Sequence, residues 1–307
     1  MKVALSPLIE ALRRRKVCHR LRQVMRGMTI DTAIIVTIAM KGLQDARRHR
    51  WFVVFAVVFA GLALTLSAAG FWGTGIAGLA GFGRTGVSLT NLVLLVVPLM
   101  GLLLGTLALV TEREQGTLWT LLAQPITPTE LLSGKWLGLA GAIAAAVLFG
   151  FGISGFVIAL FAATEQLFGY LHLLALTLLL GWANLSIGVL ISTVSSRSSV
   201  AVSVALILWL VFVWLSDLGL MGVGVALQLA PPHLLWLSLL NPSQAFRLAA
   251  LLVLQGNLEL LGAAGLYAAE VLGKWLLPFL WSLLLLWVFV PLTFALWLFG
   301  RRWASGW

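Results

Sequence analysis

The sequence TEREQGTLWTLLAQPITPTELLSGK, residues 111–135, separates two long apolar runs and is the stretch that best predicts the fold. It opens with three consecutive ionised side chains, Glu112, Arg113 and Glu114. Such side chains are costly in hydrocarbon, so a helix that arrives through the first apolar run has to leave the membrane here. The chain is therefore expected to turn back outside the membrane within this stretch.

A short amphipathic helix is expected in the middle of the stretch. Leu118, Leu121 and Leu122 share one face of it at helical spacing. Pro125 ends this helix, because proline lacks the backbone N–H and clashes with the preceding turn.

A second helix then begins with the pattern of a capping box. Thr127 is a favourable N-cap, Pro128 takes the first helical position, where proline is tolerated, and Glu130 follows three residues after the cap. We call residues 111–135 the elbow, since a helix, a kink and a second helix on one membrane face form a compact shape. That shape is suited to docking a soluble partner.

The composition indicates a polytopic membrane protein. Of the 307 residues, 61% are hydrophobic and 10% are charged, and the mean hydropathy is +1.05, far from the values of soluble domains. The single cysteine, Cys18, cannot form an internal disulfide, and no metal or cofactor motif is found. Gly134-Lys135 precedes Trp136 and lacks the glycines of a P-loop, so any ATP hydrolysis requires another subunit. The chain is not expected to be an enzyme.

Basic residues are concentrated at the N-terminus. Residues 1–50 hold 12 of the 20 Lys and Arg and only three acidic residues. Topology and anionic headgroups explain this better than nucleic acid does. Residues 1–30 are expected to form a basic amphipathic extension on the membrane surface. Residues 31–50 are expected to form an interfacial helix, because no signal-peptide cleavage site follows their apolar part.

The rest of the chain predicts an all-α fold with six transmembrane helices. They cover residues 51–70, 89–110, 137–163, 171–194, 200–216 and 275–300. Residues 71–86 are rich in glycine, which sustains a helix poorly, so a mobile loop is expected there. Residues 31–302 are interpreted as one transmembrane domain.

The segment between the fifth and sixth predicted spans is apolar but broken. Pro231-Pro232 divides residues 218–246 into pieces too short to cross a membrane, and Arg247, Glu259 and Glu270 interrupt the remainder. Two half-inserted helices on the outer side fit this pattern better than another span, provided that their bends are buried against protein.

The distribution of charge predicts the orientation. With six spans, both termini and the elbow lie on one side, and only Arg84, Arg247 and Lys274 among the Lys and Arg residues lie on the other. By the positive-inside rule, the termini and the elbow face the cytoplasm of a bacterial inner membrane.

The sequence Gly150-Phe151-Gly152-Ile153-Ser154-Gly155 matches two functional motifs, the dinucleotide fingerprint and the G-x-S-G of intramembrane serine proteases. The fingerprint requires a preceding strand. The protease requires a histidine at similar depth, whereas His172 lies at a predicted membrane edge and His233 in the outer segment. Close helix packing by small residues is the better interpretation, and a protease is a distant alternative.

Other polar and small residues in the spans are interpreted as packing groups. Asn184 and Ser186 are expected to form interhelical hydrogen bonds. No span carries an ionisable group at mid-depth, which disfavours an ion-coupled carrier. Two glycine pairs have the GxxxG spacing of close helix contacts: Gly101/Gly105 and Gly134/Gly138.

With these elements placed, the chain resembles the permeases of ABC-2 type transporters. The elbow residues that carry the resemblance are Glu112-Arg113, Gly116-Thr117-Leu118, Leu121-Leu122, Pro125, Glu130-Leu131-Leu132 and Gly134-Lys135. Within the family, the chain looks most like the permeases that serve nitrous oxide reductase maturation. The residues of that likeness are Ile38-Ala39, Lys41, Asp45, Arg48-His49-Arg50-Trp51, Leu240-Asn241-Pro242 and Phe246-Arg247.

The resemblance implies the membrane half of an ABC complex. Such a complex has two permease copies as a homodimer, two cytoplasmic ATPase subunits and, in the maturation group, a periplasmic accessory protein. It would support copper-site assembly in the reductase; export of a lipid, drug or polysaccharide is the alternative. The implied ATPase-coupling residues are Glu112, Glu114, Gly116, Thr117, Leu118, Leu121, Leu122, Pro125, Thr127 and Glu130. The implied outer-face partner contacts are Asn241, Pro242, Phe246 and Arg247.

Overall fold

The computed structural model describes most of the predicted transmembrane domain. The described residues are 32–48, 50–72, 79–118, 126–161, 164–215, 231–255 and 262–305. The predicted basic extension at residues 1–30 lies outside these ranges, and so do Leu121, Leu122 and Pro125 of the elbow.

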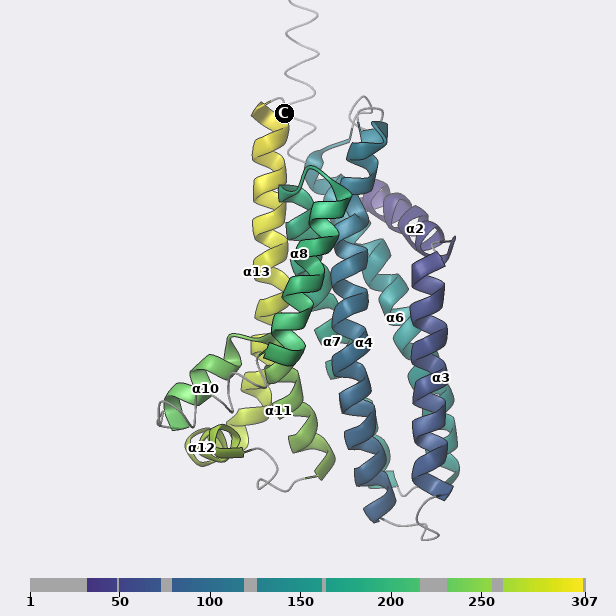
Figure 1. Ribbon diagram of the computed structural model, residues 1–307, viewed down its shortest axis with the longest axis vertical. Helices are drawn as coiled ribbons and strands as arrows, with labels where there is room; N and C mark the ends of the chain where they lie inside the picture. The colour runs from purple at the N-terminus through teal and green to yellow at the C-terminus, as the bar shows by residue number, and fades with distance from the viewer. Residues whose placement is uncertain are drawn as a thin grey trace, which may run out of the picture.

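Long helices dominate the described residues, which contain no strand. The long helices are α3 (Arg50–Trp72), α4 (Leu79–Glu114), α6 (Pro128–Phe161), α7 (Thr164–Val194) and α13 (Leu276–Ser305). They run side by side as a bundle (Figure 1). The prediction of an all-α fold is confirmed.

Four stretches of these helices are long and apolar enough to cross a membrane: Gly86–Glu114, Pro128–Gly155, Phe168–Val194 and Gly265–Arg302. Two further apolar helices, Phe52–Leu66 and Ser198–Trp214, are shorter, and one bent pair of helices could add a fifth span. The chain is therefore a multi-pass membrane protein, and the count of six spans stays a prediction.

Helix α7 lies at the centre of the bundle, where it contacts α4, α6, α11 and α13. Its seam with α4 is built on glycine. A Cβ atom on Gly101 would lie 2.7 Å from the carbonyl oxygen of Gly181, and one on Gly105 would lie 2.4 Å from that of Leu185. Only glycine allows backbones this close, so the packing role predicted for the Gly101/Gly105 pair is confirmed.

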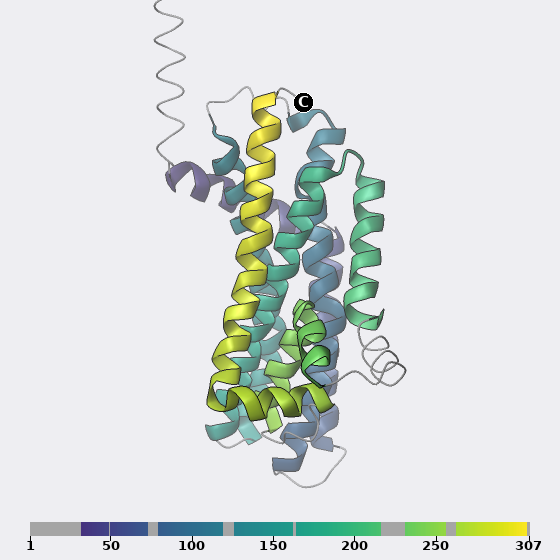
Figure 2. The ribbon, with the colours of Figure 1, turned by 90° about the vertical axis from the view of Figure 1, so that its left-hand side faces the viewer.

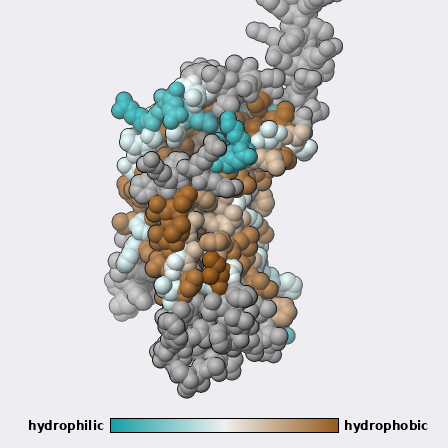
Figure 3. Space-filling model, turned by 90° about the vertical axis from the view of Figure 1, so that its right-hand side faces the viewer, coloured by the Kyte–Doolittle hydropathy of each residue, from teal (hydrophilic) through white to brown (hydrophobic). Residues whose placement is uncertain are grey.

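The second glycine pair joins α6 to α2 (Thr32–Arg48), the helix predicted from residues 31–50. A Cβ atom on Gly134 would lie 2.8 Å from Cβ of Ile38, and one on Gly138 would lie 2.5 Å from the carbonyl oxygen of Ala39. Helix α2 crosses the bundle at a steep angle to α3 (Figure 1). On this face, hydrophilic side chains gather near one end of the bundle above an apolar surface (Figure 3).

The loop predicted over residues 71–86 is wrong in its second half, because α4 begins at Leu79. Glycine lowers helix propensity by only about 1 kcal/mol per residue, and tertiary packing overrides that cost. Gly86 shows such packing: its Cα approaches Leu254 so closely that a Cβ atom would lie 2.8 Å from Leu254 Cδ2.

The end of the bundle opposite the elbow, which we call the far end, carries three short helices. They are α10 (Pro231–Leu239), α11 (Pro242–Gln255) and α12 (Gly262–Leu272). Residues 232–239 and 242–254 form a pair bent by 111°, and the half-inserted position of these helices stays a prediction. Helix α12 was not predicted as a separate helix. Figure 2 shows α12 lying crosswise at the base of α13.

The fifth predicted span is α8 (Ser198–Leu210), which continues as the π-helix η1 (Val211–Leu215). Trp209 donates a hydrogen bond from Nε1 to the carbonyl oxygen of Leu95, at 3.0 Å. This bond fixes α8 to the middle of α4 and brings η1 toward α11 at the far end.

Candidate coupling site at the elbow

The capping box predicted at the start of α6 is present in the structure. The backbone N–H of Thr127 donates to Glu130 Oε2 at 2.9 Å, and the backbone N–H of Glu130 donates to Thr127 Oγ1 at 3.2 Å. These reciprocal bonds satisfy two donors that a helix start leaves open. The side chain of Glu130 is only 3% exposed, so it fixes the position of α6 and does not present a charge to a partner.

Helix α4 ends in a tight turn at Gly116. The residue has a φ of 71°, in the left-handed region that favours glycine. Its N–H donates to the carbonyl oxygen of Arg113 at 3.2 Å. Leu118, two residues later, is 3% exposed and packs into the hydrophobic core. It is therefore a packing residue, whereas Glu114, Gly116 and Thr117 are exposed.

An ion pair joins the two helices that flank the elbow. Lys135 near the start of α6 is ion-paired with Glu112 in the last turn of α4, and its Nζ donates a hydrogen bond to the carbonyl oxygen of Ala108 at 2.8 Å. Ala108 lies within the last two turns of α4, and a cation near the C-terminal end of a helix is favoured by the helix dipole. The exit from α4 and the entrance to α6 are thus held together.

A cavity of about 340 Å³ lies beside this ion pair, between α2, α4 and α6. Gly42 and Asp45 from α2 line it together with Glu112 and Lys135. The described residues contain no group of three His, Cys, Asp or Glu side chains that could hold a metal.

Two arginines connect the elbow end of the bundle to the C-terminal end of α7. Arg113 donates to the carbonyl oxygen of Ser195, and Arg302 of α13 donates to the carbonyl oxygen of Thr193 at 2.6 Å. These carbonyls are among the last four of α7 or follow it, where intrahelical donors run out. The two arginines supply the missing donors and hold three helices at one point.

The turn between α7 and α8 is also fixed from the elbow. Glu114 Oε1 accepts a hydrogen bond from the backbone N–H of Ser198 at 2.8 Å, at the first residue of α8. Ser192 Oγ accepts from the backbone N–H groups of Leu109 and Val110, at 3.0 and 3.1 Å. Residues in the last two turns of α4 are therefore bonded to both sides of the turn between α7 and α8.

Sequence reasoning found the local part of this site and missed the contacts between distant segments. The spacing of Thr127 and Glu130 identified the capping box. The partners of Lys135, Arg113 and Glu114 are more than 20 residues away in the sequence, and no local pattern identifies them. The only signal was the presence of three ionised residues at a helix end.

The four residues predicted to contact an outer partner are mostly buried within the chain. Asn241 is 7% exposed, Phe246 is 0% exposed, and Pro242 is buried. Asn241 caps α11 through its Oδ1, which accepts from the N–H of Ser243 at 2.9 Å, and Phe246 belongs to the core. These three side chains pack inside the chain, so they shape this end of the protein from within, and a contact between this segment and an outer partner stays a prediction. Arg247 alone lines an open cavity.

The serine of the protease-like motif has a structural partner. Ser154 Oγ lies 2.8 Å from the hydroxyl of Tyr170, which donates to the carbonyl oxygen of Phe151 at 2.6 Å. His172 is exposed, and its Nδ1 lies 2.9 Å from the carbonyl oxygen of Phe168 in its own helix. Ser154 therefore joins α6 to α7. The hydrogen bond from Trp136 Nε1 to Ser186 Oγ, 3.0 Å, joins the same helices and confirms the interhelical bond predicted for Ser186.

A bundle of apolar helices with a polar, hydrogen-bonded elbow at one end is the architecture of a polytopic membrane protein. The chain belongs to the family described as ABC-2 family transporter protein, which matches residues 36–303. It is therefore an ABC transporter permease.

Two curated permeases are similar over nearly their whole length. The chain is 34% identical to the probable ABC transporter permease protein NosY of Stutzerimonas stutzeri over 271 residues, which are 86% of this chain and 97% of that protein. It is 36% identical to the probable ABC transporter permease protein NosY of Pseudomonas aeruginosa over 278 residues, 88% of this chain and 98% of that protein. The resemblance seen in the sequence is confirmed.

Proposed function

We propose that the chain is the membrane subunit of an ABC complex in which a separate cytoplasmic ATPase docks on the elbow. The observation that carries the proposal is the set of bonds behind the exposed turn at Glu114, Gly116 and Thr117. The ion pair of Lys135 and the bond from Glu114 to Ser198 tie this turn to α6 and α8. A force applied there would reach several helices at once, since packed elements shift as units.

The elbow end is proposed to face the cytoplasm of a bacterial inner membrane. Arg113, Lys135, Arg197 and Arg302 lie at this end, and short loops rich in Lys and Arg stay on the cytoplasmic side. Both termini would then be cytoplasmic, and the far end would face the periplasm.

A homodimer is proposed on the basis of family membership and of an uncovered apolar surface. Val204, Ile207 and Leu210 along α8 are exposed at the protein surface. A second copy could cover this surface, as transporters with one permease gene product require two membrane halves. The accessory periplasmic partner would meet the exposed side chains of α10 and α12, such as Trp236 and Leu266.

The process that the complex serves is proposed to be nitrous oxide reductase maturation, in support of copper-site assembly. The support is the identity of 34% and 36% to two permeases named NosY, together with the motifs at Asn241-Pro242 and Phe246-Arg247. Export of a lipid, drug or polysaccharide is the alternative within the same family. Loss of copper sites in the reductase, with an unchanged content of its polypeptide, on deletion of this chain would favour maturation.

Docking on the elbow is tested by co-purification of the ATPase with variants of the full chain. Thr117→Arg places a bulky cation on the exposed turn and should reduce the amount of bound ATPase about tenfold or more, since interface charges without partners are strongly disfavoured. Glu270→Lys, an exposed charge change in α12 at the far end, is the matched control. Equal ATPase recovery from both variants would contradict the proposal.

A further inference from the structure

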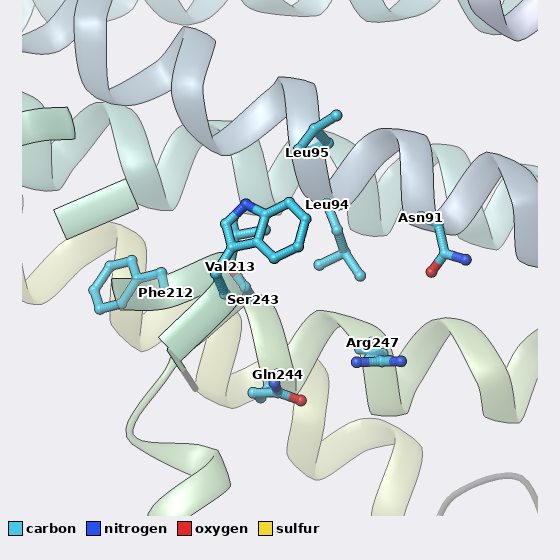
Figure 4. A pocket seen from close by; sticks show the side chains of 9 residues that line it. Asn91, Leu94, Leu95, Phe212, Val213, Ser243, Gln244 and Arg247 are labelled. Atoms are coloured by element: carbon cyan, nitrogen blue, oxygen red, sulfur yellow. The ribbon is translucent and has the colours of Figure 1, made fainter. Parts of the chain in front are cut away.

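A cavity of about 280 Å³ at the far end lies between α4, η1 and α11. Asn91 of α4 and Arg247 of α11 are on opposite walls, and Ser243 and Gln244 complete its polar side (Figure 4). All four side chains can donate hydrogen bonds. Arg247 is the one ionisable side chain among the described residues that line the cavity.

Ser243 brings a buried hydrogen-bond donor to the wall of the cavity. Its side chain is 2% exposed, and its Oγ has no hydrogen-bond partner within the described residues. A buried hydroxyl without a partner costs free energy, and such groups are rare in folded proteins. An acceptor oxygen in the cavity would satisfy this donor.

The same wall contains the start of a helix. Ser243 and Gln244 lie in the first turn of α11, which begins at Pro242. The N-terminal turn of a helix carries partial positive charge and favours anions. Arg247 is one turn further along the same helix, so its guanidinium adds a full charge on the same side.

Asn241 joins two elements that line the cavity. Its Nδ2 donates to the carbonyl oxygen of Phe212 in η1 at 2.7 Å, and its Oδ1 accepts from the N–H of Ser243 at 2.9 Å. One side chain thus fixes the π-helix to the helix start. π-helical turns frequently occur at functional sites, and this one is fixed with its side chains lining the cavity.

The remaining wall is apolar. Leu94 and Leu95 of α4 and Trp214 of η1 line it, and Trp214 is exposed at the protein surface. A ligand that fits both walls has an anionic oxygen-rich group and an apolar part. We propose that this cavity binds the phosphate-type headgroup of an anionic amphiphile, with Arg247 and Ser243 contacting the headgroup oxygens and the apolar wall contacting the chain.

The proposal is tested by thermal unfolding of the purified full chain in detergent, with added phosphatidylglycerol or with phosphatidylcholine of the same acyl chains. Ligands that bind the folded state raise the Tm in proportion to affinity and concentration. Phosphatidylglycerol should raise the Tm more than phosphatidylcholine does. Arg247→Gln should weaken the apparent affinity for phosphatidylglycerol about tenfold or more, because it removes a charge-assisted, two-pronged contact.

Three further variants separate binding from folding. Ser243→Ala should leave the Tm without lipid unlowered, since it removes an unsatisfied hydroxyl, yet weaken lipid binding. If Arg247→Gln does not fold, lipid binding by Ser243→Ala tests the proposal in its place. Arg247→Lys keeps the charge and should bind with intermediate affinity. Lys274→Gln removes an exposed charge at the same end, outside the cavity, and should bind as the unmodified chain does.

Inorganic phosphate distinguishes the source of the anion. Protection by phosphatidylglycerol without protection by phosphate supports the amphiphile. If inorganic phosphate raises the Tm, phosphatidylglycerol does not, and the effect of phosphate is lost in Arg247→Gln, the cavity binds an oxyanion and the proposal of an amphiphile is wrong. Equal protection by both lipids, or unchanged phosphatidylglycerol binding in Arg247→Gln and Ser243→Ala, overturns the site altogether. Loss of a co-purifying protein from Arg247→Gln with unchanged lipid binding would assign the arginine to a protein contact.

Discussion

Lys135 and Glu112 form an ion pair that joins the start of α6 to the end of α4, and the two side chains differ in exposure, at 13% and 30% respectively. The cation is the more buried partner and also bonds to the carbonyl oxygen of Ala108. Removing the carboxylate would leave a more deeply buried charge without its partner than removing the amine would.

The two single substitutions should therefore be unequal. We expect Glu112→Gln to lower the free energy of unfolding by about 2 kcal/mol and Lys135→Met by about 1 kcal/mol, because an unpaired Glu112 is more exposed to water than an unpaired Lys135 is. Denaturation of the purified chain in detergent measures both. Equal losses of unfolding free energy in the two single variants would contradict this prediction. A double variant whose loss equals the sum of the two single losses would show that the two side chains are not coupled.

The capping box predicts a loss of stability at Thr127. Thr127→Ala removes the side-chain acceptor for the N–H of Glu130, and loss of such a cap costs about 1 kcal/mol. Thr293→Ala is a suitable control, since Thr293 is exposed and bonds only to a carbonyl in its own helix. A Tm for Thr127→Ala equal to that of Thr293→Ala would mean that the cap does not stabilise α6.

The glycine seam between α4 and α7 predicts opposite effects for two glycine substitutions. Gly105→Ala would place a Cβ atom 2.4 Å from the carbonyl oxygen of Leu185, whereas a Cβ atom on Gly152 would have nothing within 4 Å. Gly105→Ala should destabilise by about 1 to 3 kcal/mol through overpacking. Gly152→Ala should be neutral or stabilising by up to about 1 kcal/mol, since alanine is the better helix former. A neutral Gly105→Ala would contradict the close approach of the two helices.

The bond between Ser154 and Tyr170 separates helix packing from the protease alternative. Tyr170→Phe removes the hydroxyl that contacts Ser154 and Phe151, and it should cost about 1 kcal/mol of stability. A serine-reactive fluorophosphonate should not label the chain. Labelling that disappears in Ser154→Ala would revive the protease interpretation.

How far the sequence predicted this structure depends on the range of each interaction. The capping box at Thr127 and Glu130 and the start of α10 at Pro231 follow from neighbouring residues, and both were predictable. The GxxxG spacing predicted that Gly101 and Gly105 make a close contact, but it did not identify α7 as the partner. The helical start of α4 at Leu79 was missed because glycine content suggested a loop, while packing against residues such as Leu254 decides the outcome.

At the elbow end and at the far end, too, the contacts between distant segments could not be predicted from local sequence. Arg113 and Arg302 meet at the end of α7 only because three helices separated in the sequence end at one level. The burial of Phe246 likewise depends on the packing of α11 against α4, α7 and α13. The local sequence around Asn241 and Phe246 does not distinguish an internal packing residue from a contact residue.

The most direct test of the account is photo-crosslinking of the permease in membranes that also contain the complete set of its partner subunits. A photoreactive amino acid at Thr117, on the exposed turn of the elbow, should crosslink to an ATPase subunit. The same amino acid at Trp275, exposed at the far end, should give no ATPase adduct. An ATPase crosslink from position 275, or none from position 117 while the complex is intact, would contradict the claim that the elbow is the coupling site.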